Sequence, residues 1–272
     1  MTASGLQLFL FAIDDVLLAE SLEAGVDGVV VDWESAGKHR RQLGANTEIN
    51  AQTLADLRRV RSLTSGPVLC RVNGPAADGL AQIRLAIDHG ADEILLPMVR
   101  TADEVERALV AVGGQAGLGV LIETADAVRN ARDICSLPLT RVYVGLNDLA
   151  IDRHTRSIFS ALADGTVDAV RSSVDRRMPF GVAGVTDPEE GDPLPCRHLI
   201  AELVRLGAGF TFLRWSFRRH SAERGVAETL ARIRCAFEVA RSREVAEVVS
   251  QREELIAAVR AIDDRSSLVG IG

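Results

Sequence analysis

The chain has almost no lysine, and this absence bears directly on chemistry. Lys38 is the only lysine among the 272 residues, and every other basic residue is an arginine. An enzyme that works through a Schiff base needs a lysine held in its active site. Lys38 lies in a predicted loop several residues past a strand, which is a poor place for a rigidly held amine. We therefore favour metal-assisted chemistry over imine chemistry.

Paired cysteines, long apolar runs and an excess of positive charge are also absent. The four cysteines form no Cys-x-x-Cys pair, which excludes a zinc-ribbon or thioredoxin motif. No apolar run approaches the roughly 18 residues that span a bilayer, and the first residues lack the basic segment of a signal peptide. The net charge of −7 disfavours nucleic acid and anionic membranes as partners. We expect a cytoplasmic protein with reduced thiols.

The chain does contain a regular alternation of short apolar runs and helical patterns. The runs predicted as strands are Leu6–Phe11, Gly28–Asp32, Pro67–Arg71, Glu93–Pro97, Gly117–Ile122, Arg141–Gly145, Pro179–Gly184 and Phe210–Arg214. Strands separated by helices pair in parallel, because a crossover is needed to return to the same edge. Eight such units predict an α/β fold, a (β/α)8 TIM barrel over residues 1–242. No Gly-x-Gly-x-x-Gly motif follows the first strand, which disfavours a dinucleotide-binding fold.

Helices are predicted between these strands, and one helix is left over at the end. The predicted ranges are 14–24, 51–63, 77–89, 102–112, 125–135, 166–176 and 196–206, with Asp14 or Asp15 as the first N-cap. Residues 222–263 are almost continuously helical in pattern, which is more than one barrel helix needs. We predict an extra C-terminal helix within residues 243–272, near Arg243–Ile262. It packs either on its own barrel or, as we expect, on a neighbouring subunit.

Two apolar runs end abruptly in a carboxylate. Glu123 follows the run that begins at Val120, and Asp148 closes the run that begins at Val142. In a barrel, the carboxyl ends of the strands carry the active site. Carboxylates without cysteine or clustered histidine suit Mg²⁺ or Mn²⁺. We predict that Glu123 and Asp148 are metal ligands, and the alternative for each is a helix cap or first-turn acid.

Polar residues at the other strand ends complete the predicted site. Arg71 can grip a substrate carboxylate and stabilise an oxyanion, or it forms a salt bridge at the barrel rim. Asp32 and Glu34 are two positions apart, so both side chains can face the barrel mouth. They are predicted catalytic residues, or else partners for Lys38 or Arg71. Further residues predicted to contact substrate are Pro97, Met98 and Asn147.

Five stretches, taken in order, resemble the 4-hydroxy-2-oxoheptanedioate aldolase / citrate lyase beta-subunit family. They are Val29–Ser35, Cys70–Asn73, Leu95–Val99, Leu121–Thr124 and Gly145–Leu149, and the resemblance spans residues 6–215. It implies a (β/α)8 barrel, a divalent metal held by Glu123 and Asp148, and an Arg71 that binds the 2-oxo acid or its enolate. The implied substrates are a 2-oxo acid with an aldehyde, or an acyl-CoA. The extra C-terminal helix would serve oligomer contacts, and we expect a homo-oligomer, either a trimer or a hexamer.

Two departures from the aldolases in this family bear on mechanism. Ser35 stands where they carry a histidine used in acid–base chemistry, and Leu121 stands where a glutamine helps to hold pyruvate. Both changes move the chain toward the citrate-lyase-like branch. A serine needs its own activator to act as a base. The proton-transfer role therefore stays open between a metal-bound water, Asp32, Glu34 and the displaced His39.

Three functions are carried forward from the sequence. The leading one is a divalent-metal-dependent carbon–carbon lyase or aldolase that acts through the enolate of a pyruvate-like 2-oxo acid. The second is a CoA-ester lyase or thioesterase, which needs a basic groove for the nucleotide phosphates. The arginines that could supply this groove are Arg40, Arg41, Arg218 and Arg219. The third is a binding or assembly protein that has kept the barrel without its activity.

Overall fold

A single parallel sheet forms the centre of the molecule. The computed structural model describes residues 5–11, 14–35 and 52–269. The strands are β1 (Gln7–Phe11), β2 (Gly28–Asp32), β3 (Val68–Arg71), β4 (Glu93–Leu96), β5 (Gly117–Ile122), β6 (Arg141–Val144), β7 (Phe180–Val182), β8 (Gly184–Val185) and β9 (Phe210–Leu213). Their order is β7-β6-β5-β4-β3-β2-β1-β9-β8, and every pair is parallel.

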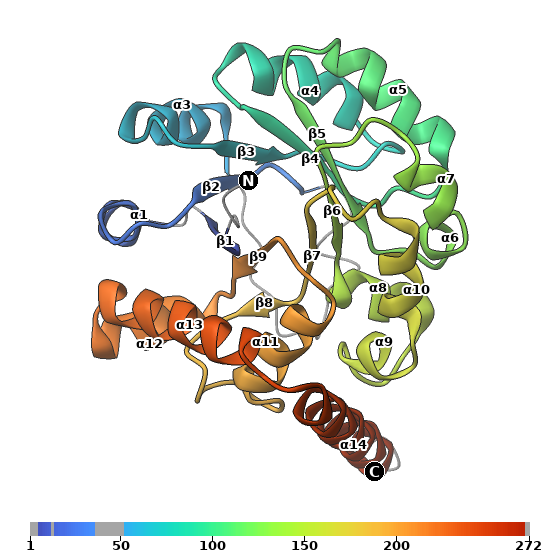
Figure 1. The fold of residues 1–272 in the computed structure, drawn as a ribbon. Helices are drawn as coiled ribbons and strands as arrows, with labels where there is room; N and C mark the ends of the chain where they lie inside the picture. The colour runs from blue at the N-terminus through green and yellow to red at the C-terminus, as the bar shows by residue number, and fades with distance from the viewer. Residues whose placement is uncertain (1–4, 12–13, 36–51, 270–272) are drawn as a thin grey trace.

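The two ends of this sheet meet at one residue. β7 pairs with β6 and β8 pairs with β9, and only Ala183, in a left-handed conformation with φ of 50°, separates β7 from β8. The sheet therefore curves into a nearly closed barrel with the helices outside it (Figure 1). This confirms the predicted barrel. The strand predicted as one run over 179–184 is divided, because each half pairs with a different neighbour.

The helices follow the predicted order with three differences. They are α1 (Asp15–Glu23), α3 (Leu54–Leu63), α4 (Gly79–Asp88), α5 (Ala102–Val112), α6 (Ala125–Arg129), α7 (Ala131–Cys135), α8 (Leu146–Arg153), α9 (Ser160–Ala163), α10 (Thr166–Ser173), α11 (Cys196–Arg205), α12 (Ser216–Arg224), α13 (Val226–Arg241) and α14 (Val245–Val269). Asn130 divides the helix predicted over 125–135. Gly225, at φ of 93°, ends α12 and separates it from α13. The region after β6, predicted as a loop, contains α8 and α9.

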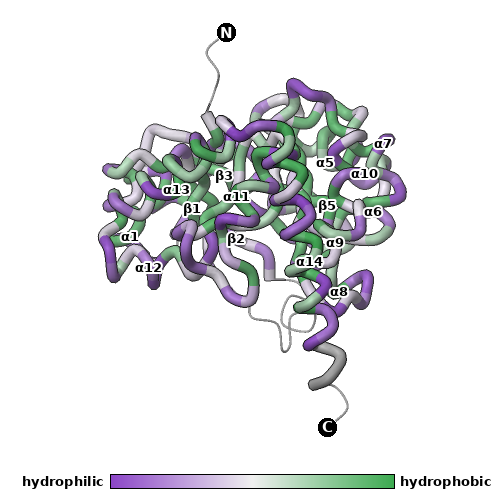
Figure 2. The backbone as a smooth tube through the Cα atoms, turned by 60° about the horizontal axis from the view of Figure 1, so that its bottom comes forward, coloured by the Kyte–Doolittle hydropathy of each residue, from purple (hydrophilic) through white to green (hydrophobic). Residues whose placement is uncertain are grey.

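Alternation along the strands builds two hydrophobic layers. Leu8 and Leu10 on β1 pack outward against the helices, whereas Phe9 between them points into the barrel. The barrel interior contains Phe9, Val30, Leu69, Leu95, Leu121, Tyr143, Phe210 and Phe212. Hydrophobic and hydrophilic residues alternate along the surrounding chain, as expected for helices that pack one face on a barrel (Figure 2). Among the described residues, no helix is long and apolar enough to cross a membrane.

A buried ion pair lies inside the barrel at the starts of β4 and β6. The Nε of Arg141 donates to Glu93 at 2.7 Å, and its guanidinium lies 4.6 Å from the ring of Phe9 and 4.7 Å from that of Phe210. Because strands β4 and β6 begin here, this is the end of the barrel opposite the expected active site. The ion pair and the two aromatic rings occupy this end of the barrel, so the active site is expected at the carboxyl end.

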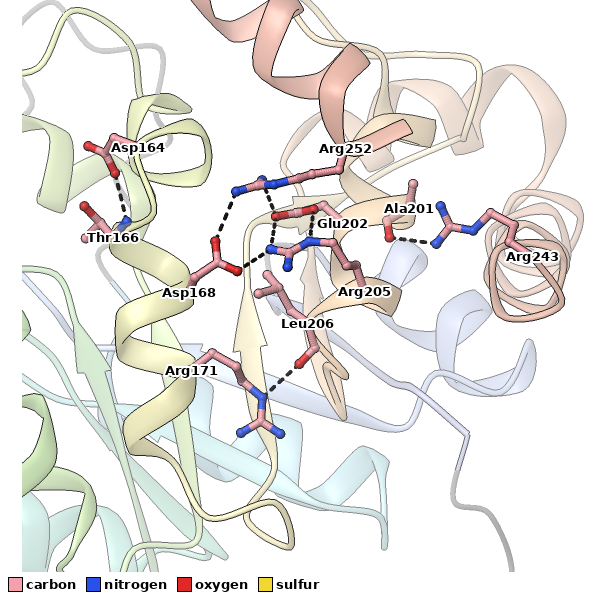
Figure 3. A network of polar contacts seen from close by, with 10 residues as sticks. All are labelled: Asp164, Thr166, Asp168, Arg171, Ala201, Glu202, Arg205, Leu206, Arg243 and Arg252. Atoms are coloured by element: carbon pink, nitrogen blue, oxygen red, sulfur yellow. Dashed lines mark hydrogen bonds and ion pairs between the residues drawn. The ribbon is translucent and has the colours of Figure 1, made fainter. Parts of the chain in front are cut away.

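The C-terminal helix α14 packs on its own barrel. It contacts α9 and α11. Its residues Leu255, Val259 and Ile262 belong to the hydrophobic core, and their i, i+4, i+7 spacing gives one buried stripe. Figure 3 shows a network that joins α14 to α11: Glu202 on α11 accepts from Arg205 and from Arg252 of α14. Both arginines also reach Asp168 on α10. A further role of α14 in subunit contacts stays a prediction.

Truncation of the buried stripe is expected to destabilise the whole chain. Val259 is fully buried, and Val259→Ala removes two methyl groups and leaves a gap, at a cost of about 2 kcal/mol. Val249 on the same helix is 53% exposed, so Val249→Ala is expected to change stability by less than about 0.5 kcal/mol. Urea unfolding of both variants measures this difference. Equal stability of the two would show that α14 does not depend on this contact.

Candidate active site

A cavity of about 220 Å³ opens at the carboxyl ends of the strands. Residues from β1, β3, β4, β5, β6, β8 and β9 line it, together with the start of α8. The charged groups among them are Arg71, Glu123, Asp148, Arg214 and Arg218. The cavity therefore brings together four of the residues predicted from strand ends, namely Arg71, Glu123, Asn147 and Asp148. It lies where barrel enzymes carry their active sites.

Arg71 is held by two acids from β2 and the residues after it. Its Nε donates to Oδ1 of Asp32 at 2.8 Å and its Nη2 to Oδ2 at 2.7 Å, which is a bidentate pair. Its Nη1 lies 3.4 Å from Oε2 of Glu34. Both acids are almost fully buried. Burial alone would lower the pKa of Arg71, but the charges of Asp32 and Glu34 outweigh it and raise this pKa well above its usual value.

This geometry shows Asp32 and Glu34 in one of the roles left open for them, that of partners for Arg71. β2 and β3 are neighbours with Asp32 beside Arg71 in the register, so the acids meet the arginine across the sheet. Because Asp32 occupies only one edge of the guanidinium, other N–H groups of Arg71 can turn toward the cavity. Catalytic action by Asp32 or Glu34 stays a prediction.

Glu123 follows β5 and is fixed by a backbone amide. The N–H of Met98 donates to its Oε1 at 2.8 Å. Met98 adopts a φ of 56°, which a non-glycine residue rarely does, and this conformation marks a constrained position. Burial, followed by the negative charge of Asp148, raises the pKa of Glu123 well above its usual value. The two carboxylates therefore lie close enough to repel each other.

Asp148 reaches the same place from the first turn of α8. The helix begins at Leu146, with Gly145 as its N-cap, so Asp148 lies inside a helix rather than in a loop after β6. Gly145 is what lets the two acids approach, because a methyl group at that position would overlap Oε2 of Glu123. The φ of Gly145 is −83°, which any residue can adopt. Its role is therefore to leave space for the carboxylate.

The donors in this cavity fit a hard divalent cation. Two buried carboxylates that repel each other gain from a cation between them, and Mg²⁺ typically takes one or two carboxylates. The space at Gly145 forms a cradle around the Glu123 carboxylate. Within the described residues, no group of three His, Cys, Asp or Glu side chains converges as a closed metal cage. Such a donor set would leave coordination positions open for substrate or water.

We expect the stability of the metal-free protein to fall as pH rises through the raised pKa of Glu123. Folding favours its protonated form, so the proton's contribution is fully present below about pH 4.3, the usual glutamate pKa. That contribution is lost as pH rises through the folded-state pKa. Urea unfolding in chelator, measured from about pH 4.3 upward, gives the free energy of unfolding as a function of pH. This free energy should change less with pH for Glu123→Gln than for the wild type. Parallel profiles would show that another group titrates.

The other predicted residues are placed as follows. Asn147 lines the cavity beside Asp148. Pro97 is buried, and Met98 contributes its backbone amide to Glu123, so direct substrate contact by either side chain stays a prediction. Ser35 is exposed, with its N–H donating to Asn73 at 2.8 Å. The residues that lie outside the described part of the chain are Lys38, His39, Arg40 and Arg41.

Two lining residues received no role from the sequence. Arg214, the last residue of the strand predicted over 210–214, follows β9, and Tyr143 lies within β6. Tyr143 is the only tyrosine of the chain. It lies two positions before Gly145, on the inward-facing side of the strand. The alternation of inward and outward side chains along β6 could have indicated that Tyr143 faces the cavity. It does so only once the inward face of β6 is known.

Comparisons with known proteins agree with this architecture. A crystal structure of an HpcH/HpaI aldolase from Desulfitobacterium hafniense superposes with a TM-score of 0.59 at 16% identity, covering 84% of this chain and 93% of that one. A family protein from Burkholderia cenocepacia gives 0.58 at 17% identity, over 84% and 95% of the two chains. Citrate synthase SbnG gives 0.58 at 21% identity, over 83% and 94%. At these identities the likenesses show the fold.

Sequence comparison identifies the family. A search of curated proteins finds no match. The sequence model of HpcH/HpaI aldolase/citrate lyase matches residues 6–174, which is more than half of the chain and includes Arg71, Glu123 and Asp148. With the barrel and the placement of these residues at its carboxyl end, the match shows that the chain belongs to the HpcH/HpaI aldolase/citrate lyase family, a family of lyases and aldolases.

Proposed function

We propose that the protein is a divalent-metal-dependent carbon–carbon lyase that acts through the enolate of a pyruvate-like 2-oxo acid. One observation carries the proposal: the buried carboxylates of Glu123 and Asp148 share a cavity with Arg71. Carboxylates suit Mg²⁺ or Mn²⁺, and a guanidinium suits the carboxylate of a 2-oxo acid. The family, which generally depends on a divalent metal, supports this assignment.

Each residue would make a distinct contribution. Glu123 and Asp148 would hold the metal, which when bound acts as a Lewis acid toward the 2-oxo group. Arg71, kept in one orientation by Asp32 and Glu34, would bind the substrate carboxylate and stabilise the charge of the enolate oxygen. Leu95, Leu121 and Phe212 line the cavity, and these apolar side chains exclude water from the reactive carbon.

The reaction balances without an oxidant or reductant. In the bond-forming direction a proton leaves the methyl carbon of pyruvate, that carbon bonds to the carbonyl carbon of an aldehyde, and the aldehyde oxygen takes up a proton. Cleavage is the reverse. Of the two acids at Arg71, Glu34 makes the longer contact, 3.4 Å against 2.7 Å for Asp32. We propose that the carboxylate of Glu34 removes this proton from the methyl carbon.

Exchange of the pyruvate methyl protons with deuterium tests this proposal without knowledge of the aldehyde. In D₂O with Mg²⁺, the protein should remove the methyl signal of pyruvate from the ¹H NMR spectrum. EDTA should stop the exchange, and added Mg²⁺ should restore it. Exchange that persists in EDTA would contradict the metal assignment.

The same measurement separates the two alternatives. A CoA-ester lyase should exchange the methyl protons of acetyl-CoA rather than those of pyruvate. Arg218, which lines the cavity and pairs with Asp14 at 3.4 Å, is the described arginine best placed for CoA phosphates. A thioesterase should exchange neither compound but should release free CoA from acetyl-CoA, whereas a binding or assembly protein should do neither. Each outcome selects one of the three functions.

A further inference from the structure

Arg214 occupies the side of the cavity formed by β9. Phe210 and Phe212 point into the barrel and Leu213 points outward, so alternation turns Arg214 toward the cavity that it lines. Its backbone N–H donates to Val185 at 2.8 Å, which continues the pairing of β8 with β9. A methyl group at Gly184 would come within 2.5 Å of its Cγ. The glycine at 184 therefore leaves room for the arginine side chain.

The charge of Arg214 is not neutralised by the described residues. Arg71 is paired with Asp32 and Glu34, whereas no acid of the described chain lies within ion-pair distance of Arg214. Its Nη1 is buried and has no hydrogen-bond partner among those residues. A buried guanidinium N–H without a partner loses its hydration and gains nothing in return. The side chain as a whole is only half-buried and lines the cavity, so an anion supplied by a ligand there would neutralise its charge.

Tyr143 places a second donor on the same side of the cavity. Its ring lies 4.5 Å from that of Phe212, the inward residue two positions before Arg214, and it lines the cavity. Burial raises the pKa of Tyr143, so the phenol stays protonated at neutral pH and can donate a hydrogen bond. A guanidinium and a neutral phenol together suit the oxygens of a carboxylate or a phosphoryl group.

We propose that Arg214, with Tyr143 nearby, binds an anionic group at the far end of the second substrate, an aldehyde or ketone that carries a carboxylate or a phosphoryl group. This rests on the proposed function, because Glu123, Asp148 and Arg71 would hold the 2-oxo acid. Arg71 would be occupied by the 2-oxo acid and Arg218 is paired with Asp14, so Arg214 is the described cavity arginine left for a second anion. It is therefore a residue that determines specificity.

The first test compares charged and neutral acceptors in pyruvate addition with Mg²⁺. The pairs are succinic semialdehyde with butanal, and glyceraldehyde 3-phosphate with glyceraldehyde. Arg214→Met should lower kcat/KM about 10-fold to 100-fold for the anionic member that the wild type prefers, the range of one charged hydrogen bond. The neutral partner should change less than about threefold. The preferred pair distinguishes a carboxylate from a phosphoryl ligand.

Two controls exclude other causes. Arg197→Met removes a 53% exposed arginine outside the cavity lining and should keep the preference, because a general electrostatic field would weaken with either change. Deuterium exchange into pyruvate needs no acceptor and should survive Arg214→Met. Equal losses for charged and neutral acceptors, or no preference in the wild type, would overturn the proposal.

Binding of simple anions tests Arg214 even if the protein does not act on pyruvate. Titration of succinate and of inorganic phosphate, followed by the fluorescence of Trp215 in the cavity lining, should show saturable binding of one anion. Arg214→Met should abolish that binding and Arg214→Lys should weaken it. Anion binding that depends on Arg214 without exchange into pyruvate would contradict the proposed function but not the role of Arg214. Exchange without anion binding through Arg214 would contradict the role of Arg214 but not the proposed function.

Discussion

Glu123→Gln is expected to lower Mg²⁺-dependent exchange and turnover by about 1,000-fold or more. The change keeps the shape of the side chain but removes one of the two carboxylates that would hold the metal. A bound cation contributes several kcal/mol of charge stabilisation, and each 1.36 kcal/mol corresponds to tenfold in rate. Asp148→Asn should have an effect of the same size. Exchange of pyruvate protons over a range of Mg²⁺ concentrations measures both.

A matched control separates the metal site from general acidity. Asp126 lies two residues into the helix after Glu123, and its side chain is 46% exposed and paired with Arg129. Asp126→Asn should leave exchange within about twofold, as expected of a surface change. The double variant of Glu123 and Asp148 should be little worse than either single one, because residues that act as a unit are not additive. Full activity of Glu123→Gln in chelator would contradict the metal assignment.

Arg71→Met is expected to destabilise the protein by about 3–5 kcal/mol as well as to abolish activity. Asp32 and Glu34 are buried against this guanidinium, and removing one partner of a buried ion pair leaves uncompensated charge. Methionine keeps much of the length of the side chain, so lost packing is a minor part of the effect. Unfolding in urea gives the change in free energy, and the exchange assay gives the change in activity.

Neutralising the acids separates the two effects of Arg71. The triple variant Arg71→Met, Asp32→Asn, Glu34→Gln should recover most of the lost stability, because no buried charge remains unpaired. It should stay inactive, because it has neither the guanidinium that would bind the substrate carboxylate nor the carboxylate of Glu34 that would remove the methyl proton. Recovery of activity together with stability would show that Arg71 only supports the fold. No recovery of stability would show that the ion pairs are not the reason for the loss.

Local patterns predicted the barrel well and its interruptions poorly. The strands Gly28–Asp32 and Gly117–Ile122 and the helix over 102–112 have their predicted bounds, and Asp14 caps α1 as expected. Buried parallel strands are continuous apolar runs, which the sequence displays directly. The division at Ala183 depends on which neighbour each half pairs with. That is a property of the closed sheet and not of the run itself.

The sequence predicted which residues form the candidate site, but their arrangement depends on how the strands pair around the barrel. Glu123 and Asp148 were found because a carboxylate at the end of a buried strand has no packing role. The contact of Asp32 with Arg71 was one of two open alternatives, and the register of β2 with β3 brings the two side chains together. The missed start of α8 at Leu146 changes the setting of Asp148 from a loop to a helical first turn. The role of Arg214 depends on its having no ion-pair partner among the described residues, which no local pattern displays.

A crystal soaked with Mn²⁺ and oxalate, an analogue of the pyruvate enolate, tests the metal-dependent function most directly. Anomalous scattering from Mn²⁺ should give one peak in the cavity, with a carboxylate oxygen of Glu123 and one of Asp148 as ligands. Oxalate should complete the coordination and contact Arg71. Mn²⁺ bound elsewhere while the two carboxylates hold no metal, or oxalate bound away from Arg71, would contradict the proposed function.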